Sequence, residues 1–146
     1  TMPAHLSVIA SCVVLLLALI SLPGAACAKK KGGMSPDFEK IGNQAMQDFQ
    51  RGRYTEAYDG FLKLQKMQPK NHELYVAAGQ ALQKTGNYEG ALSQFQKAIS
   101  VIQPKDRKKQ AEPYEKIGEL FKSLDDIGQA KAAYDSALEA DPKKIS

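Results

Sequence analysis

The chain has little of the chemistry on which enzymes and metal proteins depend. Tryptophan is absent among its 146 residues, and histidine and cysteine occur twice each. Both cysteines, Cys12 and Cys27, lie near the N-terminus, so no thiol remains from residue 29 onward. His72 is the only histidine in that part of the sequence. A zinc site needs several nitrogen or sulfur ligands, and a nucleophile needs a neighbouring base. We therefore expect no enzymatic activity, no catalytic residue, no metal site and no cofactor.

Charged side chains are also absent from residues 1–28. The apolar run Leu6–Leu22 is followed by Pro23 and Gly24 and then by small residues that end at Ala28. This order is typical of a secretory signal peptide, with Ala26 and Ala28 at the small-residue positions before the cleavage site. We expect cleavage after Ala28 and export to the periplasm or the medium.

Two other interpretations of residues 1–28 remain open. No basic residue precedes the apolar run, whereas Lys29–Lys31 follow it, and the positive-inside rule then favours a retained anchor. Cys27 after Ala25 and Ala26 partly matches a bacterial lipobox, although Gly24 stands where leucine is usual. An uncleaved segment would be the protein's only contact with a membrane.

The net charge of +4 is unevenly distributed. Three short segments, 29–31, 105–109 and 143–144, carry +3, +3 and +2, which leaves −4 for the rest. A nucleic-acid-binding surface needs a basic stripe across a folded face, so we expect no nucleic-acid partner. Residues 29–35 are predicted to be a flexible basic linker, and residues 143–146 a tail.

A repeat occupies the remaining chain. Seven positions recur after 34 residues and again after 39: Ile41, Ala45, Gly52, Tyr54, Ala57, Phe61 and Leu64, then Tyr75, Gly79, Gly86, Tyr88, Ala91, Phe95 and Ala98, then Tyr114, Gly118, Asp125, Ile127, Ala130, Tyr134 and Ala137. This pattern resembles the tetratricopeptide repeat, whose period is 34 residues. The resemblance covers residues 36–142, with repeats at about 38–71, 72–105 and 111–144.

The resemblance implies an all-α fold, a right-handed α-solenoid of three antiparallel helix hairpins. The helices are expected near 36–51, 54–67, 71–85, 88–102, 112–124 and 127–140, with an exposed basic loop at 105–110. Small residues would let paired helices cross closely, and the recurring aromatics would fill the space between neighbouring units. About three such units must stack before the array is stable.

In this family the first helix of each unit lines a groove that binds a peptide or helix of a partner protein. The positions that carry over are Asn43, Met46, Gln50, Val76, Gln80, Gln83, Glu115, Glu119 and Lys122. Some members clamp a C-terminal carboxylate at positions that correspond to Gly42, Met46, Ala77, Glu112 and Lys116. Only Lys116 is a cation here, so we do not expect that clamp. The groove is instead expected to suit a segment with some positive charge, with Met46 and Val76 as apolar anchors.

A second candidate interface is the outer side of the last helix, because no seventh helix follows it. Its residues are Ala133, Tyr134, Ala137 and Leu138, and it would pair with another copy or with a partner. The sequence thus favours a protein–protein interaction adaptor or scaffold in the bacterial cell envelope. The alternative is a self-associating structural component of an envelope assembly, such as a secretion or filament apparatus.

Cleavage of the signal peptide is directly testable. Protein purified from its native host should begin at Lys29 when its N-terminus is sequenced, because the small residues before that site suit a signal peptidase. A mature protein that begins at Thr1, or that carries a lipid on Cys27, would contradict this prediction.

Overall fold

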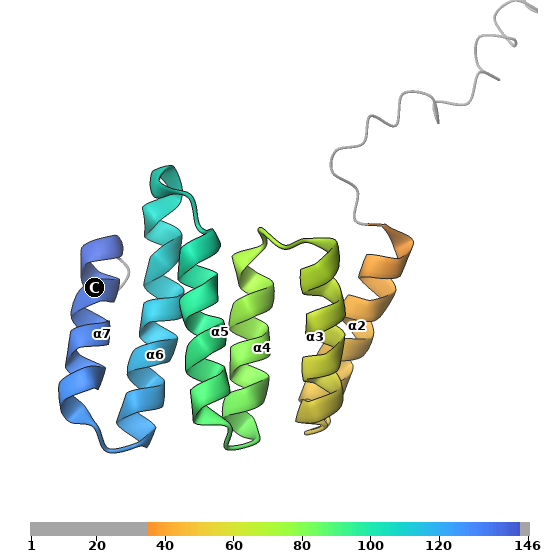
Figure 1. Cartoon of the computed structure of the whole chain (residues 1–146), viewed down its shortest axis with the longest axis horizontal. Coiled ribbons are helices and arrows are strands. Elements are labelled where there is room, and N and C mark those ends of the chain that lie inside the picture. Colours follow the sequence, from red (N-terminus) through yellow and green to blue (C-terminus); the bar gives the residue numbers. More distant parts are fainter. Residues whose placement is uncertain (1–34, 144–146) are drawn as a thin grey trace, which may run out of the picture. The chain divides into compact units, whose positions relative to one another are not determined.

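A computed structural model describes residues 35–143, in which every regular element is helical (Figure 1). The elements are α2 (Pro36–Gln50), α3 (Tyr54–Met67), α4 (His72–Lys84), α5 (Tyr88–Val101), the 3₁₀ helix η2 (Pro104–Gln110), α6 (Ala111–Ser123) and α7 (Ile127–Ala140). Within residues 35–143, no helix is both long and apolar enough to cross a bilayer. The predicted signal peptide, most of the predicted linker and the end of the tail lie outside the described residues.

The six α-helices form three consecutive hairpins, as the repeat predicts, and their ends differ from the expected ends by about one residue. Polar side chains fix where several of them begin. Ser35, Asn71, Asn87 and Asp126 each accept a hydrogen bond from a backbone N–H of the first helical turn, at 2.9–3.2 Å. Such caps satisfy N–H groups that have no partner inside the helix.

The turn inside each hairpin needs a left-handed residue at the same position of the repeat. Gly52 and Gly86 have φ angles of 79° and 81°, and Asp125 takes their place in the third hairpin with a φ of 62°. Glycine adopts this conformation without a steric penalty, and aspartate tolerates it better than most residues. The recurrence of these positions in the sequence therefore reflects backbone geometry.

Within each hairpin the two helices meet at a residue with little or no side chain. A Cβ atom added to Gly79 would lie 2.5 Å from the ring of Phe95, and one added to Gly118 would lie 2.7 Å from the ring of Tyr134. The first hairpin places its glycine on the second helix instead, where a Cβ at Gly60 would lie 2.6 Å from that of Ala45. The expected close crossings are thus present in all three hairpins.

Successive hairpins stack through two apolar clusters. Phe61 and Leu64 of α3 pack with Leu74, Ala78 and Ala81 of α4. In the next cluster, Phe95 and Ala98 of α5 pack with Ile117 and Leu120 of α6. Phe61 and Phe95 are 4% and 0% exposed and occupy equivalent niches, whereas Tyr134 on the last helix is half-buried. Burying a phenylalanine contributes roughly 2–3 kcal/mol, so these two rings are major contributors to the stacking.

The two stacking interfaces differ in one polar feature. The Gln65 side chain donates hydrogen bonds to the Leu74 carbonyl at 3.2 Å and to Gln94 Oε1 at 3.1 Å, and both glutamines are buried. This pair joins α3 to α5. One repeat later the same positions are Ile99 and Ala133, so the interface of α5 with α7 has no such bridge.

The structure corrects the prediction that residues 105–110 form a loop. These residues belong to η2, which contacts α6 and α7. Pro104 at the first position favours this helical start, and the Asp106 N–H donates to the Gln103 carbonyl at 2.8 Å. Arg107 lies 3.8 Å from Glu139 of α7, an exposed and therefore weak ion pair. The segment is exposed and basic as expected, but it is a 3₁₀ helix with a kink at Asp106 (φ −102°, ψ 23°).

The close crossing of α4 and α5 yields a stability prediction. Gly79→Ala should lower the free energy of unfolding by about 1–2 kcal/mol, because the new methyl group overlaps the buried Phe95 ring. Urea denaturation would measure the change.

Gly42→Ala is the matched control, since a Cβ there would meet only Leu64 Cδ1 at 3.9 Å. That variant should gain up to about 1 kcal/mol from the higher helix propensity of alanine. Equal effects of the two substitutions would contradict the packing described above.

Candidate partner-binding site

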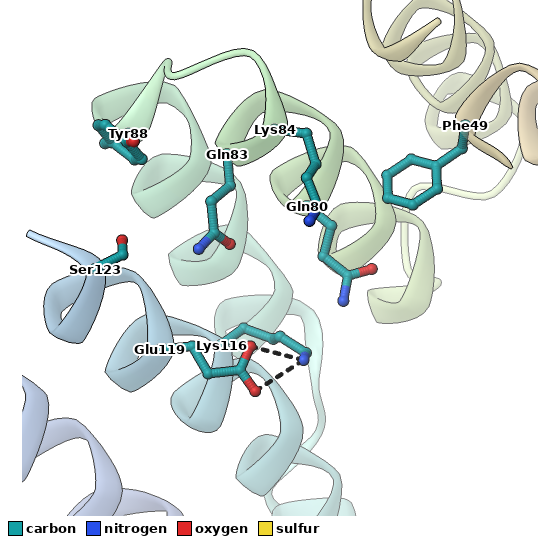
Figure 2. Close-up of a pocket in the computed structure, with 8 residues that line it drawn as sticks. All are labelled: Phe49, Gln80, Gln83, Lys84, Tyr88, Lys116, Glu119 and Ser123. Atoms are coloured by element: carbon teal, nitrogen blue, oxygen red, sulfur yellow. Dashed lines mark hydrogen bonds and ion pairs between the residues drawn. The ribbon is translucent and has the colours of Figure 1, made fainter. Parts of the chain in front are cut away.

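A surface pocket of about 440 Å³ lies between the first helices of the second and third hairpins (Figure 2). Helix α4 contributes Gln80, Gln83 and Lys84, and α6 contributes Lys116, Glu119 and Ser123. Phe49 of α2 and Tyr88 of α5 complete the lining. On each first helix these residues are spaced by three or four positions, which brings them to one face of the helix.

Charge in the pocket is largely neutralised. Lys116 Nζ lies 3.0 and 2.9 Å from the two carboxylate oxygens of Glu119, as the dashed lines in Figure 2 show. Lys84 is exposed and forms no ion pair within residues 35–143. One unmatched positive charge therefore remains, because Glu119, one of the predicted groove residues, is paired with Lys116.

The remaining lining is suited to hydrogen bonding beside an aromatic ring. The amides of Gln80 and Gln83 each offer donors and an acceptor, which match the N–H and C=O groups of an extended peptide. Phe49 is half-buried and packs edge to face against Tyr54, with ring centroids 5.3 Å apart. The pocket can therefore hold a peptide backbone and one apolar side chain.

The structure brings together three of the groove residues expected from the sequence: Gln80, Gln83 and Glu119 line the same pocket. The other predicted groove residues do not line this pocket. Asn43, Met46, Gln50 and Lys122 are exposed but do not line it, and Glu115 is half-buried.

The structure corrects the prediction that Val76 is an apolar anchor of the groove. It is 4% exposed and belongs to the cluster that contains Phe95 and Ile117, so its side chain faces the next hairpin. Sequence reasoning also missed Phe49, Lys84, Tyr88 and Ser123 as pocket residues. Lys84 lies one helical turn beyond Gln80, and that spacing could have revealed it.

The second candidate interface is only partly open. Ala133 and Ala137 are buried, and the Tyr134 ring packs against Gly118. Leu138 is 39% exposed, and the charged residues Lys131 and Asp135 lie near it on the exposed side of α7. Whether this face pairs with another protein stays a prediction.

Within residues 35–143, no group of three or more His, Cys, Asp or Glu side chains is placed to hold a metal ion. Every buried side-chain nitrogen and oxygen atom described there has a hydrogen-bond partner. The polar groups of the core are thus engaged in holding the helices together.

Three stacked antiparallel hairpins, with a pocket lined by their first helices, define the class of helical-repeat scaffolds. Residues 72–104 and 111–144 match the family model of the tetratricopeptide repeat. The second and third hairpins are therefore tetratricopeptide repeats. The first hairpin lies outside the matched residues and shares the helix–turn–helix geometry.

Several solved structures share this fold. MamA is 20% identical with a TM-score of 0.61, and the match covers 74% of this chain and 60% of MamA. The Yersinia enterocolitica type III secretion chaperone SycD, in complex with a peptide of the translocator YopD, is 19% identical with a TM-score of 0.65, over 75% of this chain and 80% of SycD. The first repeat domain of Spaghetti, bound to an HSP90 peptide, is 22% identical with a TM-score of 0.60, over 74% and 82%. No curated protein matches the chain.

These identities establish the fold, and the chain spans less than two thirds of MamA. What MamA, SycD and Spaghetti bind is a property of those proteins.

Proposed function

We propose that this protein is a non-catalytic adaptor that binds an extended segment of a partner protein in the pocket between α4 and α6. One observation carries the proposal: polar side chains from α4 and α6 converge with an aromatic ring from α2 on a single pocket. The SycD and Spaghetti structures support it, because each has the same fold and is bound to a peptide.

The pocket also indicates the chemistry of the ligand. Gln80 and Gln83 would bind the peptide backbone, and Phe49 would contact an apolar side chain. Lys84 is the cation left unpaired, so a segment with an acidic group beside Lys84 is favoured over the positively charged segment that the sequence suggested. An exposed lysine contributes modestly, about 0–1 kcal/mol per pair. Selectivity would therefore depend on several contacts together.

The proposed location is the bacterial cell envelope. It rests on the sequence of residues 1–28, which resembles a signal peptide and otherwise offers a membrane anchor or a lipid site. The alternative role, a self-associating component of an envelope assembly, is favoured by the exposure of Leu138 at the outer side of α7. Sedimentation of the purified protein over a range of concentrations would test that alternative.

Variants of the pocket test the adaptor role. Crosslinking of the native protein followed by mass spectrometry would identify the partner segment, and calorimetry would then measure its affinity. Lys84→Glu combined with Gln80→Ala should weaken binding at least about tenfold, or about 1.4 kcal/mol, because the substitutions remove an amide and reverse the unpaired charge.

The matched control is Lys97→Glu combined with Gln96→Ala, two exposed residues of α5 that do not line the pocket. This control should bind the partner normally, and circular dichroism should show unchanged helicity in both variants. Unchanged affinity in the Lys84 variant would exclude this pocket as the binding site.

A further inference from the structure

A second groove lies on the first hairpin, at one end of the row of helices (Figure 1). It has a volume of about 770 Å³ and is lined only by α2 and α3. Ile41, Ala45 and Gly60 provide its apolar part, and charged side chains surround them. None of the elements described between residues 35 and 143 covers it.

The repeat relates this groove to a pocket at the third hairpin. A pocket of about 440 Å³ at the third hairpin is lined by seven residues of α6 and α7. All seven have counterparts 73 positions earlier that line the groove on α2 and α3. Gly60 corresponds to Ala133, for example, and Asp48 corresponds to Phe121.

The two sites differ in whether a third helix forms one of their walls. At the third hairpin, α5 supplies a further wall through Leu92, Gln96 and Ile99. At the first hairpin, the position equivalent to that of α5 has no helix among the described residues. The surface of α2 and α3 therefore has the shape that accepts an α-helix parallel to α3, as α6 and α7 accept α5.

Glycine at position 60 keeps this surface open. A Cβ atom there would lie 2.6 Å from Ala45 Cβ, so α2 and α3 pack directly against each other at this point. In the second hairpin the same position is Gln94, whose side chain bonds to Gln65 of the preceding α3. The first hairpin offers no such polar bridge, and an apolar side chain of an incoming helix can lie over Gly60.

Charge separates along the groove. Because α2 and α3 are antiparallel, Asp48, Glu56 and Asp59 lie toward one end, and Lys40, Lys63 and Asp37 lie toward the other. Asp48 pairs with Arg53 and accepts hydrogen bonds from Gln44. Glu56, Asp59, Lys40 and Lys63 form no ion pair within residues 35–143. The end near the start of α3 is thus acidic, and the end near its last turn, with Lys40, Lys63 and Asp37, has a net charge of +1.

We propose that this groove binds an amphipathic helix of a partner protein, parallel to α3, with basic residues in its first half and acidic residues in its second half. Complementary charges at both ends fix the direction of the helix, and an apolar stripe between them covers Ile41, Ala45 and Gly60. The site is separate from the pocket between α4 and α6, so each can be tested without the other.

The chain itself supplies a template for a probe. A fluorescent peptide with the α5 sequence Tyr88–Val101, held helical by a side-chain lactam on its outward face, would carry the substitutions L92K and Q96E. Leu92 and Gln96 line one pocket with the counterparts of Asp48, Glu56 and Lys63. In a helix parallel to α3, the position of Leu92 lies nearer the acidic end and that of Gln96 nearer the other end. Fluorescence anisotropy with the full chain at low salt should show saturable binding, at least about tenfold tighter than for the exchanged peptide with L92E and Q96K.

Variants of the full chain then locate the site. Glu56→Lys combined with Asp59→Lys should weaken binding of the first probe at least about tenfold and strengthen binding of the exchanged probe. The variant with Lys84→Glu and Gln80→Ala should bind the first probe normally, which separates this groove from the pocket of the proposed function.

Three results of the anisotropy measurements would overturn the proposal. They are absence of saturable binding, equal binding of the two probes, and loss of binding in the Lys84 variant. Sedimentation that shows self-association of the unliganded chain, abolished by the Glu56 and Asp59 substitutions, would assign the groove to a second copy and would also overturn it.

Discussion

The contact between Gly79 and the ring of Phe95 sets how closely α4 can approach α5. The same ring is fully buried in the cluster that joins the second hairpin to the third, so one side chain couples the packing inside a hairpin to the stacking between hairpins. Gly118 with Tyr134, and Gly60 with Ala45, give the other hairpins an equivalent close crossing. Protein interiors are close-packed and adjust little, so these contacts fix the spacing of the array and the position of every surface residue on it.

This packing leaves only part of each first helix open to a ligand. On α4, Val76 packs against the third hairpin, whereas Gln80 and Lys84, one and two turns further along the helix, line the open pocket. On α6, Ile117 and Leu120 are buried while Lys116 and Glu119 line the pocket. The residues available to a ligand are thus the ones that the stacking does not use. Such a surface can vary without cost to the core, which is how one fold carries many binding specificities.

The ends of the array differ from its interior. Positions that are apolar inside the array are charged at its edges: Phe121 has Asp48 as its counterpart in the first hairpin, and Leu92 has Lys131 in the third. Charged terminal faces keep repeat arrays soluble. The groove on α2 and α3 has apolar residues between charges of opposite sign. Such a surface would favour a helix with an apolar stripe and would fix the direction in which that helix binds.

The sequence by itself determined the helical hairpins, their boundaries to about one residue and the close-crossing positions. Each of these follows from local features: the 34-residue period, capping residues such as Asn71, and the left-handed turn at Gly52 and Gly86. The groove residues were predicted only in part. A carried-over position does not show where along a helix the neighbouring hairpin covers it, and the third hairpin buries Val76 one turn before Gln80 reaches the pocket.

Only the tertiary structure decided which side chains meet. Lys116 pairs with Glu119 in the pocket, and residues 104–110 form a 3₁₀ helix that contacts α6 and α7. The groove on α2 and α3 corresponds to the pocket that α5 shares with α6 and α7, and this could be seen only from the residues that line both sites. The correspondence between the two grooves depends on distances between helices, which periodicity alone does not fix.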